Sequence, residues 1–471
     1  MPKEESFKQL KKKLLRERLA AHDHFTADRR KEVEPFCADY MAFLDKVKTE
    51  RLAVREIERF ARRARFKSLR ADATGSRFYY SFKGKAAALV HLGRQPISKG
   101  VNVVVSHVDS PRLDMKPEPL YEDQGLALLK THYYGGIRKH QWVTRPLALY
   151  GVVVLANGDT VEIAIGDDDG DPVFTVTDLL PHLAAKAQNA KKMADAIPGE
   201  KLNVLFGGRP LGKPGDGKNR VKLQILKLLY DKYGIVEEDL ISAELEFVPA
   251  GPARHVGLDR AAIGAYGQDD CICVYTSLRA LLDLDKRPKR TSIALFMDKE
   301  EIGSFGNTGA HGRFFPDLIG RLLEREGVCS EMAVFRAIAE SRVLSADVNA
   351  ALDPSWPDVH DKRNAAYFGR GVCLTKYTGT RGKSGASDAH AEFLGEVRRT
   401  LNAAKVPWQT GELGKIDEGG GGTVALYFAT HGCDVLDVGP ALLSMHSPFE
   451  LAHKDDVYSA YLAYKAFFEK A

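Results

Sequence analysis

The spacing of hydrophobic and polar positions changes near residue 78. Before it, apolar residues recur at helical intervals among many Lys and Arg residues. The clearest sets are Phe7, Leu10, Leu14 and Leu15, followed by Tyr40, Phe43, Leu44 and Val47. This spacing predicts amphipathic helices that pack on a larger body.

After residue 78, short apolar runs alternate with helical patterns. Runs rich in β-branched residues predict strands at residues 101–106, 161–165, 243–248, 292–297, 343–346 and 435–438. Helical spacing predicts helices at residues 271–284, 387–401, 422–430 and 457–468. Strands that alternate with helices indicate an α/β fold, in which helices sandwich a mixed sheet.

Residues 112–250 have a different pattern of turns and hydrophobic positions. Glycine-rich turns at residues 135–136, 166–170 and 207–208 separate alternating strand patterns. We therefore predict a β-rich domain at residues 112–250, inserted into an α/β domain formed by residues 1–111 and 251–471. Two domains also suit a chain of 471 residues, which exceeds the usual size of a single core.

The charge pattern argues against nucleic-acid and membrane partners. The 68 basic and 63 acidic residues are interspersed, so the net charge of +5 creates no strong field of one sign. No apolar run approaches the ~18 residues that cross a bilayer. The six cysteines form neither a disulfide framework nor a CxxC pair. These features predict a cytoplasmic location.

Two glycine motifs suggest ligand loops. Residues 207–213 fit the spacing of a phosphate loop, but Pro214 follows where that loop needs Ser or Thr, which favours a connecting loop. Residues 419–422 are all glycine and precede a predicted helix. They either let the backbone approach a ligand or form a tight connection, and both interpretations stay open.

Four apolar strands lead into side chains that bind metals. They lie in residues 103–109, 295–301, 343–347 and 435–446. In α/β sheets, ligand sites gather at the carboxyl ends of strands, so these side chains are expected to converge. Each one alone also has a structural explanation, such as a hydrogen-bonded histidine or a solvated charged turn.

Two pairs within these segments suggest metal chemistry. Strand alternation places His107 and Asp109 on one side, where Asp109 can accept the second N–H of the imidazole, as carboxylates do beside zinc ligands. Glu300 and Glu301 follow a buried strand, and adjacent carboxylates there repel unless a divalent cation neutralises them. One would bind metal while the other accepts a proton from water.

Two further positions complete the candidate set. Asp269 and Asp270 precede an apolar helix, so one can be a cap while the other bridges two cations. The residues that precede His446 in the sequence are mostly apolar, which is typical of a buried ligand.

In their order, these motifs resemble the aspartyl aminopeptidase family of dizinc exopeptidases, in its bacterial branch. The matching segments are residues 106–111, 267–270, 298–304, 345–347 and 444–447. The resemblance implies peptide substrates and two Zn²⁺ per subunit, with Co²⁺ and Mn²⁺ as alternatives. It implies that His107, Asp269 and Asp347 hold one ion, while Asp269, Glu301 and His446 hold the other. Glu300 would be the general base, and Asp109 would support His107.

The resemblance also implies an assembly and a specificity. The insert would be a dimerisation domain whose His182 contacts substrate in the neighbouring subunit, and the family forms dodecamers of such dimers. Lys376 lies near a lysine of relatives that select N-terminal Asp or Glu. The chain departs from eukaryotic members at Asp353-Pro354, where they have His-Pro, so the specificity pocket is expected to differ.

Two other functions remain alternatives. The same metal arrangement serves carboxypeptidases and other amidohydrolases, which would also cleave substrates with a blocked N-terminus. A non-catalytic relative would bind metal without hydrolysing any peptide.

Overall fold

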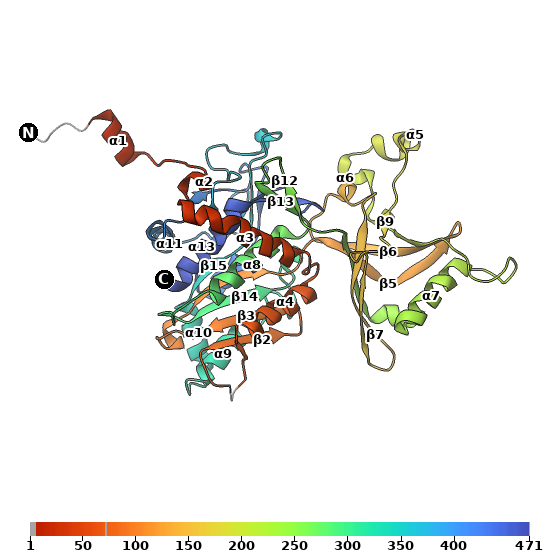
Figure 1. Cartoon of the computed structure of the whole chain (residues 1–471), viewed down its shortest axis with the longest axis horizontal. Helices are drawn as coiled ribbons and strands as arrows, with labels where there is room; N and C mark the ends of the chain where they lie inside the picture. The colour runs from red at the N-terminus through yellow and green to blue at the C-terminus, as the bar shows by residue number, and fades with distance from the viewer. Residues whose placement is uncertain (1–5, 71–72, 471) are drawn as a thin grey trace, which may run out of the picture.

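The computed structural model describes residues 6–70 and 73–470, and Figure 1 shows that they form two lobes. The larger lobe contains a nine-stranded sheet in the order β1-β2-β3-β14-β4-β15-β21-β17-β19. Its strands are β1 (Lys67–Ser68), β2 (Arg77–Phe82), β3 (Ala86–His91), β14 (Ser292–Met297), β4 (Asn102–His107), β15 (Arg342–Ser345), β21 (Asp434–Gly439), β17 (Val372–Thr375) and β19 (Trp408–Thr410). The four central strands, β14 to β21, are parallel, whereas β3 and β17 run antiparallel to them. The predicted mixed α/β sheet is therefore confirmed.

Helices cover both faces of this sheet. Alternate side chains of one strand enter different cores, since Val104 packs with one cluster and Val103 with another. The first cluster includes residues of α3 (Ala27–Leu44), α4 (Glu50–Arg63), α8 (Gln268–Leu282), α11 (Ala391–Ala403) and α13 (Lys454–Lys470). The second includes residues of α9 (Phe314–Glu324), α10 (Glu331–Ala339) and α12 (Ala425–Thr430). Burial on both faces explains why the central strands are rich in apolar residues, although β21 also carries the buried Asp437.

One prediction for the N-terminal region is wrong. The apolar residues of α3 are buried, as expected, but α1 (Phe7–Leu14) stands away from the body (Figure 1), with Phe7 83% and Leu14 70% exposed. A capping box between Ser6 and Gln9 closes its first turn. Hydrophobic spacing predicts the apolar face of a helix but not the surface that covers it.

The smaller lobe is built on a seven-stranded antiparallel sheet, in the order β8-β7-β11-β5-β6-β10-β9. Its strands are β5 (Arg112–Asp123), β6 (Leu126–Tyr134), β7 (Leu147–Val154), β8 (Thr160–Ile165), β9 (Thr175–Val176), β10 (Val204–Gly207) and β11 (Ala243–Pro249). This sheet has its own apolar cluster, which includes Trp142 and Phe247. Residues 208–219 connect β10 to α7 (Arg220–Tyr233). The domain boundaries at residues 112 and 250 stay a prediction.

Charged residues are buried where the two lobes meet. Glu50 of α4 lies 3.1 Å from Lys85 Nζ and 3.6 Å from Arg112, which also lies 3.2 Å from Glu246 of β11 and 2.8 Å from Asp114. We call these five residues the arginine cluster. Burial raises the pKa of Glu50, but Arg112 and Lys85 outweigh it and bring this pKa to about 2. Cations of the chain itself therefore neutralise this buried carboxylate.

No helix in the described ranges is both long and apolar enough to cross a membrane.

Candidate metal centre

The predicted ligands come from the carboxyl edge of the nine-stranded sheet and from two neighbouring segments. His107 is the last residue of β4, and Asp347 follows β15. Glu301 lies in the short helix η6 (Glu300–Ile302), three residues after β14 ends. Asp269 begins α8, and His446 follows β22 (Ala441–Leu443) of a separate five-stranded sheet. Parallel strands thus bring residues that are distant in the sequence to one edge.

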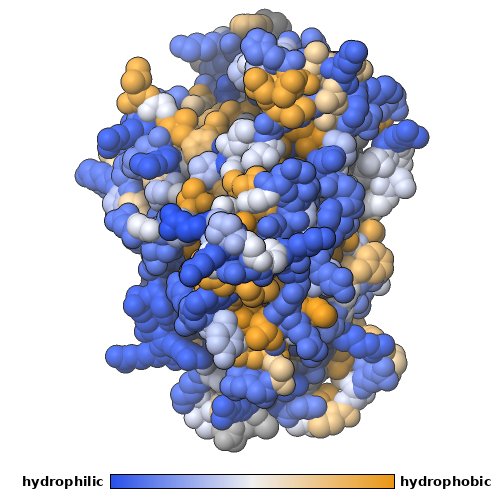
Figure 2. Space-filling view, turned by 90° about the vertical axis from the view of Figure 1, so that its right-hand side faces the viewer, coloured by the Kyte–Doolittle hydropathy of each residue, from blue (hydrophilic) through white to orange (hydrophobic). Residues whose placement is uncertain are grey.

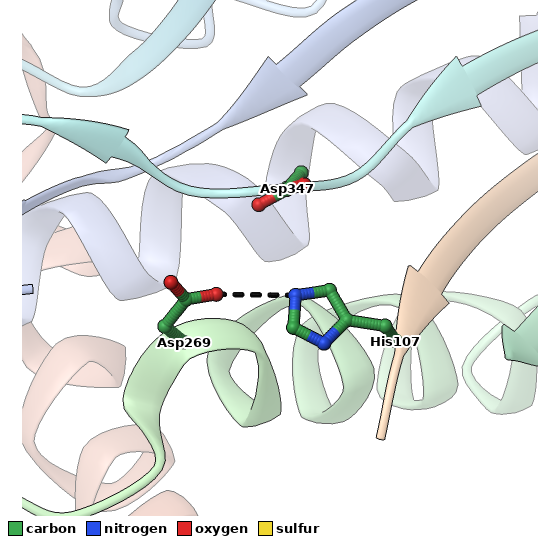
Figure 3. Close-up of side chains that lie close together, drawn as sticks. All are labelled: His107, Asp269 and Asp347. Atoms are coloured by element: carbon green, nitrogen blue, oxygen red, sulfur yellow. Dashed lines mark hydrogen bonds and ion pairs between the residues drawn. The ribbon is translucent and has the colours of Figure 1, made fainter. Parts of the chain in front are cut away.

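These side chains form two groups that share one carboxylate. One ligand atom each of His107, Asp269 and Asp347 lies within 4.8 Å of the others, and the same holds for Asp269, Glu301 and His446. Asp269 Oδ1 lies 3.1 Å from His107 Nε2, and its Oδ2 lies 3.2 Å from His446 Nε2. Figure 3 shows His107 and Asp269 pointing toward each other, with Asp347 beside them. We call these five residues the metal cluster.

The charges of the metal cluster suit a cation. In residues 6–70 and 73–470, no Lys or Arg forms an ion pair with its carboxylates. The Glu301 side chain is 3% exposed, and its Oε1 has no hydrogen-bond partner in these ranges. Burial, followed by repulsion from Asp269, raises the pKa of Glu301 well above its usual range. Imidazole nitrogens and carboxylate oxygens are zinc ligands, so this donor set fits zinc.

Glu300 lies beside the metal cluster with the properties of a proton acceptor. Burial raises its pKa to about 7, with Asp109 and Asp269 adding to the effect and His107 opposing it. A carboxylate with a pKa near the working pH is well matched to general base catalysis.

Asp109 connects His107 to the turn that carries the two glutamates. The imidazole Nδ1 of His107 lies 2.9 Å from the backbone oxygen of Asp109 and 3.4 Å from its Oδ1. The two carboxylate oxygens of Asp109 accept the backbone N–H groups of Glu300 and Glu301, each at 3.1 Å. Asp109 therefore contacts His107 mainly through its backbone, while its carboxylate holds the turn.

A cleft of about 650 Å³ opens onto the metal cluster. Its lining includes Glu300, Tyr377, Arg381, Lys383 and Lys415, together with the four glycines 419–422. The close approach requires glycine, because a Cβ on residue 420 would lie 2.3 Å from the carbonyl oxygen of residue 379. The glycine run thus forms both a tight connection and part of the cleft wall.

The structure does not bring the two predicted substrate contacts to this cleft. Lys376 is exposed and does not line it. His182 is exposed on α5 (Pro181–Ala184), which Figure 1 shows at the outer end of the smaller lobe. Any contact of His182 with substrate would have to be made in another subunit.

The structure also reveals supporting residues that the sequence analysis missed. Buried Glu450 accepts the backbone N–H of His446 at 2.7 Å and that of Asp269 at 3.1 Å. Burial and repulsion from Asp269 raise its pKa to about 8. Asp270 accepts the backbone N–H of His107 at 3.2 Å. Glu450 is the first residue of β23 (Glu450–His453), and its place in the sequence does not reveal these partners.

A mixed α/β sheet with a buried, uncompensated histidine and carboxylate cluster at its edge defines a metallohydrolase class. Comparison with known proteins identifies the family within this class. Residues 43–468 match the family described as aminopeptidase I zinc metalloprotease (M18), and the chain belongs to this family. It is accordingly a zinc-dependent aminopeptidase, a peptide hydrolase.

Relatives and solved structures agree with this assignment. A probable M18 family aminopeptidase 1 of Clostridium acetobutylicum is 45% identical over 461 residues, covering 96% of this chain and 98% of the relative. The crystal structure of an M18 aminopeptidase from Thermotoga maritima superposes with a TM-score of 0.93 at 47% identity, covering 97% of this chain and all of that one. The fold is also shared by the S. cerevisiae mApe1 dodecamer, at a TM-score of 0.72, 21% identity, and coverage of 92% and 95%.

Proposed function

We propose that this chain removes the N-terminal residue of peptides with the help of two zinc ions. His107, Asp269 and Asp347 would hold one ion, and Asp269, Glu301 and His446 the other. The shared Asp269 supports this most strongly, because each of its oxygens faces a different histidine at 3.1 and 3.2 Å. Co²⁺ and Mn²⁺ remain alternatives to zinc.

The residues around these ligands would have separate roles in hydrolysis. Bound zinc supplies a Lewis acid that polarises the scissile carbonyl and lowers the pKa of a water molecule. Glu300 accepts the proton of the attacking water and returns it to the leaving amine. Asp109 fixes the turn that carries Glu300, because it accepts two backbone N–H groups there.

A substitution of Glu300 tests its role as the general base. Glu300→Gln should keep two zinc ions per chain, while kcat falls by about 100-fold or more, the usual contribution of a general base. Metal analysis and steady-state kinetics on one peptide measure both quantities. Near-normal turnover would remove Glu300 from this role. In the same assay, cleavage of N-blocked peptides would favour another amidohydrolase, and zinc without any hydrolysis would favour a non-catalytic relative.

We also propose a preference for N-terminal Asp or Glu, with a different cation from the one expected. Lys383 lies 3.2 Å from Asp388, whereas Arg381 has no ion pair with a carboxylate in the described ranges. Because Arg381 lines the cleft and Lys376 does not, Arg381 is the better candidate to bind an acidic side chain.

Comparing peptides that begin with Asp and with Leu tests this preference. Arg381→Gln should raise KM for the Asp peptide by about 10-fold, the loss of one charge-assisted contact, and leave the Leu peptide unchanged. Lys376→Gln is the matched control and should change neither. Equal cleavage of both peptides by the native chain would rule out acidic specificity.

A homo-oligomer of dimers, extending to a dodecamer, completes the proposal. Figure 2 views the smaller lobe end-on and shows apolar patches among its charged residues. Leu179, Leu180, Leu183 and Met193 of this lobe are exposed, and such patches favour subunit contacts. The dodecamer of the yeast relative supports the larger assembly. In such an assembly His182 would contact the neighbour's substrate. A cytoplasmic location stays a prediction.

A further inference from the structure

The smaller lobe reaches the metal cluster through the end of one strand. Strand β6 ends at Tyr134, and Gly135 and Gly136 follow it. Tyr134 Oη donates a hydrogen bond to Asp109 Oδ2 at 2.8 Å, and the carbonyl oxygen of Gly136 lies 2.8 Å from His446 Nδ1. A three-residue segment of the smaller lobe thus contacts both a proposed ligand and the residue that holds the glutamate turn.

The Gly136 contact would fix the state of the His446 ring. A carbonyl oxygen only accepts hydrogen bonds, so His446 Nδ1 must carry the proton that it donates. In the neutral ring, Nε2 is then free of a proton, and this is the atom that faces Asp269 at 3.2 Å. Neutral imidazole with one nitrogen held in this way is the usual form of a metal-binding histidine.

Gly135 brings the backbone close to the second glutamate. Its φ of +74° lies in the region that favours glycine. A Cβ at this position would lie 3.1 Å from Glu301 Oε2 and 3.2 Å from Glu301 Cβ. The absence of a side chain therefore lets the segment pass directly beside Glu301.

The position of Tyr134 is itself set by the smaller lobe. Its strand partner is Arg112 of β5, whose guanidinium lies 3.9 Å from the centre of the Tyr134 ring. Arg112 is held by Glu246 of β11 at 3.2 Å. The phenol is thus fixed by two strands of the antiparallel sheet while its hydroxyl points at Asp109.

We propose that residues 134–136 are a positioning element through which the smaller lobe sets the geometry of the metal site. Tyr134 orients Asp109, and with it the turn of Glu300 and Glu301, while Gly136 orients His446. None of the three is proposed to contact substrate. This inference rests on the proposed zinc site, and it gives the smaller lobe a function within its own chain, separate from assembly.

Tyr134→Phe tests the proposal, because it removes the hydroxyl and keeps the ring under Arg112. Zinc affinity, measured by competition with a chromogenic chelator, should fall by about 10- to 100-fold, as for other residues that orient metal ligands. At saturating zinc, kcat should fall while KM stays unchanged. The matched control is Tyr150→Phe in β7, whose hydroxyl donates to Asp167 at 2.7 Å, away from the metal cluster. This control should keep native zinc affinity and kcat.

The outcomes separate this inference from the proposed function. Native zinc affinity in Tyr134→Phe would overturn the inference, and so would an equal loss in Tyr150→Phe, since that would be a general effect on the sheet. Failure of the native chain to bind two zinc ions would instead overturn the proposed site. Gly136→Ala provides a second variant in case Tyr134→Phe does not fold. Its Cβ would lie 3.3 Å from His446 Nδ1, so zinc affinity should again fall, and an unchanged value would count against the inference.

Discussion

The metal cluster and the arginine cluster are two buried groups that contain acidic residues, but only the arginine cluster has Lys or Arg side chains paired with its carboxylates in the described ranges. In the arginine cluster, Arg112 and Lys85 hold the pKa of Glu50 at about 2 although that residue is fully buried. In the metal cluster, where no such cation is paired in the described ranges, burial drives the pKa of Glu301 upward. The chain supplies a counter-charge for Glu50 at the junction of the lobes, whereas in the proposed metal site a bound ion would supply the counter-charge for Glu301.

Removing the shared carboxylate should give the largest effect. Asp269→Asn takes away one negative charge and replaces one of the two oxygens that face the histidines by an amide nitrogen, so bound zinc should fall from two ions to fewer than one. Peptidase activity should fall by about 1,000-fold or more, because the Lewis acid is lost. Metal analysis and turnover measure this. The native chain should lose activity in the same way when a chelator removes its zinc, and it should regain activity when zinc is added back. The variant should not regain activity. Full activity in the variant would contradict a shared ligand.

Removing Arg112, one of the two cations of the arginine cluster, should lower the stability of the fold. Arg112→Met leaves Glu246 buried without the cation that it pairs with, while Glu50 keeps Lys85 at 3.1 Å, and should lower the free energy of unfolding by about 3–5 kcal/mol. Urea unfolding of the zinc-free protein measures this change. Arg55→Met is the control: it removes an exposed ion pair with Glu162 and should cost less than about 1 kcal/mol. Similar losses in the two variants would erase the distinction between buried and exposed pairs.

The smallest effect concerns His91, a buried group that has no ion pair with a carboxylate in residues 6–70 and 73–470. His91 is 3% exposed, and burial, followed by repulsion from Arg77 and Arg287, lowers its pKa to about 4. Between pH 6.5 and 4 the unfolded chain binds a proton at this residue that the folded chain does not. The free energy of unfolding should therefore fall by about 2 kcal/mol as pH drops through this window.

Comparing the native chain with His91→Leu isolates this contribution. Unfolding by urea at pH 7.5 and at pH 4.5 gives the pH-dependent loss for each protein, and the loss should be smaller in the variant. Identical losses would show that His91 takes up a proton without cost.

The sequence predicted the catalytic sheet well because its signal is local. Each central strand is buried on both faces, so a run rich in apolar residues marks it, and the four predicted central strands overlap β4, β14, β15 and β21. The other two predicted strands overlap β8 and β11 of the seven-stranded sheet. His107, Glu301 and Asp347 lie at or shortly after the ends of these strands, so parallel pairing predicts their convergence, whereas Asp269 and His446 come from a helix and from another sheet. The four predicted helices likewise correspond to α8, α11, α12 and α13.

What sequence could not predict depends on contacts between distant segments. Glu450 lies only four residues from His446, but its second hydrogen bond reaches Asp269, 181 residues away. Tyr134 contacts Asp109, 25 residues away, across the junction of the lobes, and no metal motif surrounds Tyr134 in the sequence. Lys376 does not line the cleft because its side chain points in another direction. A shift of one position along an extended segment turns a side chain to the other face, so Tyr377 lines the cleft and Lys376 does not.

The distance along the chain between residues of the metal cluster also affects when activity can appear during synthesis. His107 and His446 lie roughly 340 residues apart, and both face Asp269 in the folded protein. At about 5–20 residues per second, a ribosome would take about 17–70 s to pass from the first histidine to the second. During that interval no nascent chain holds the complete ligand set. If these residues are the ligands, hydrolysis would therefore begin only after His446 has been synthesised.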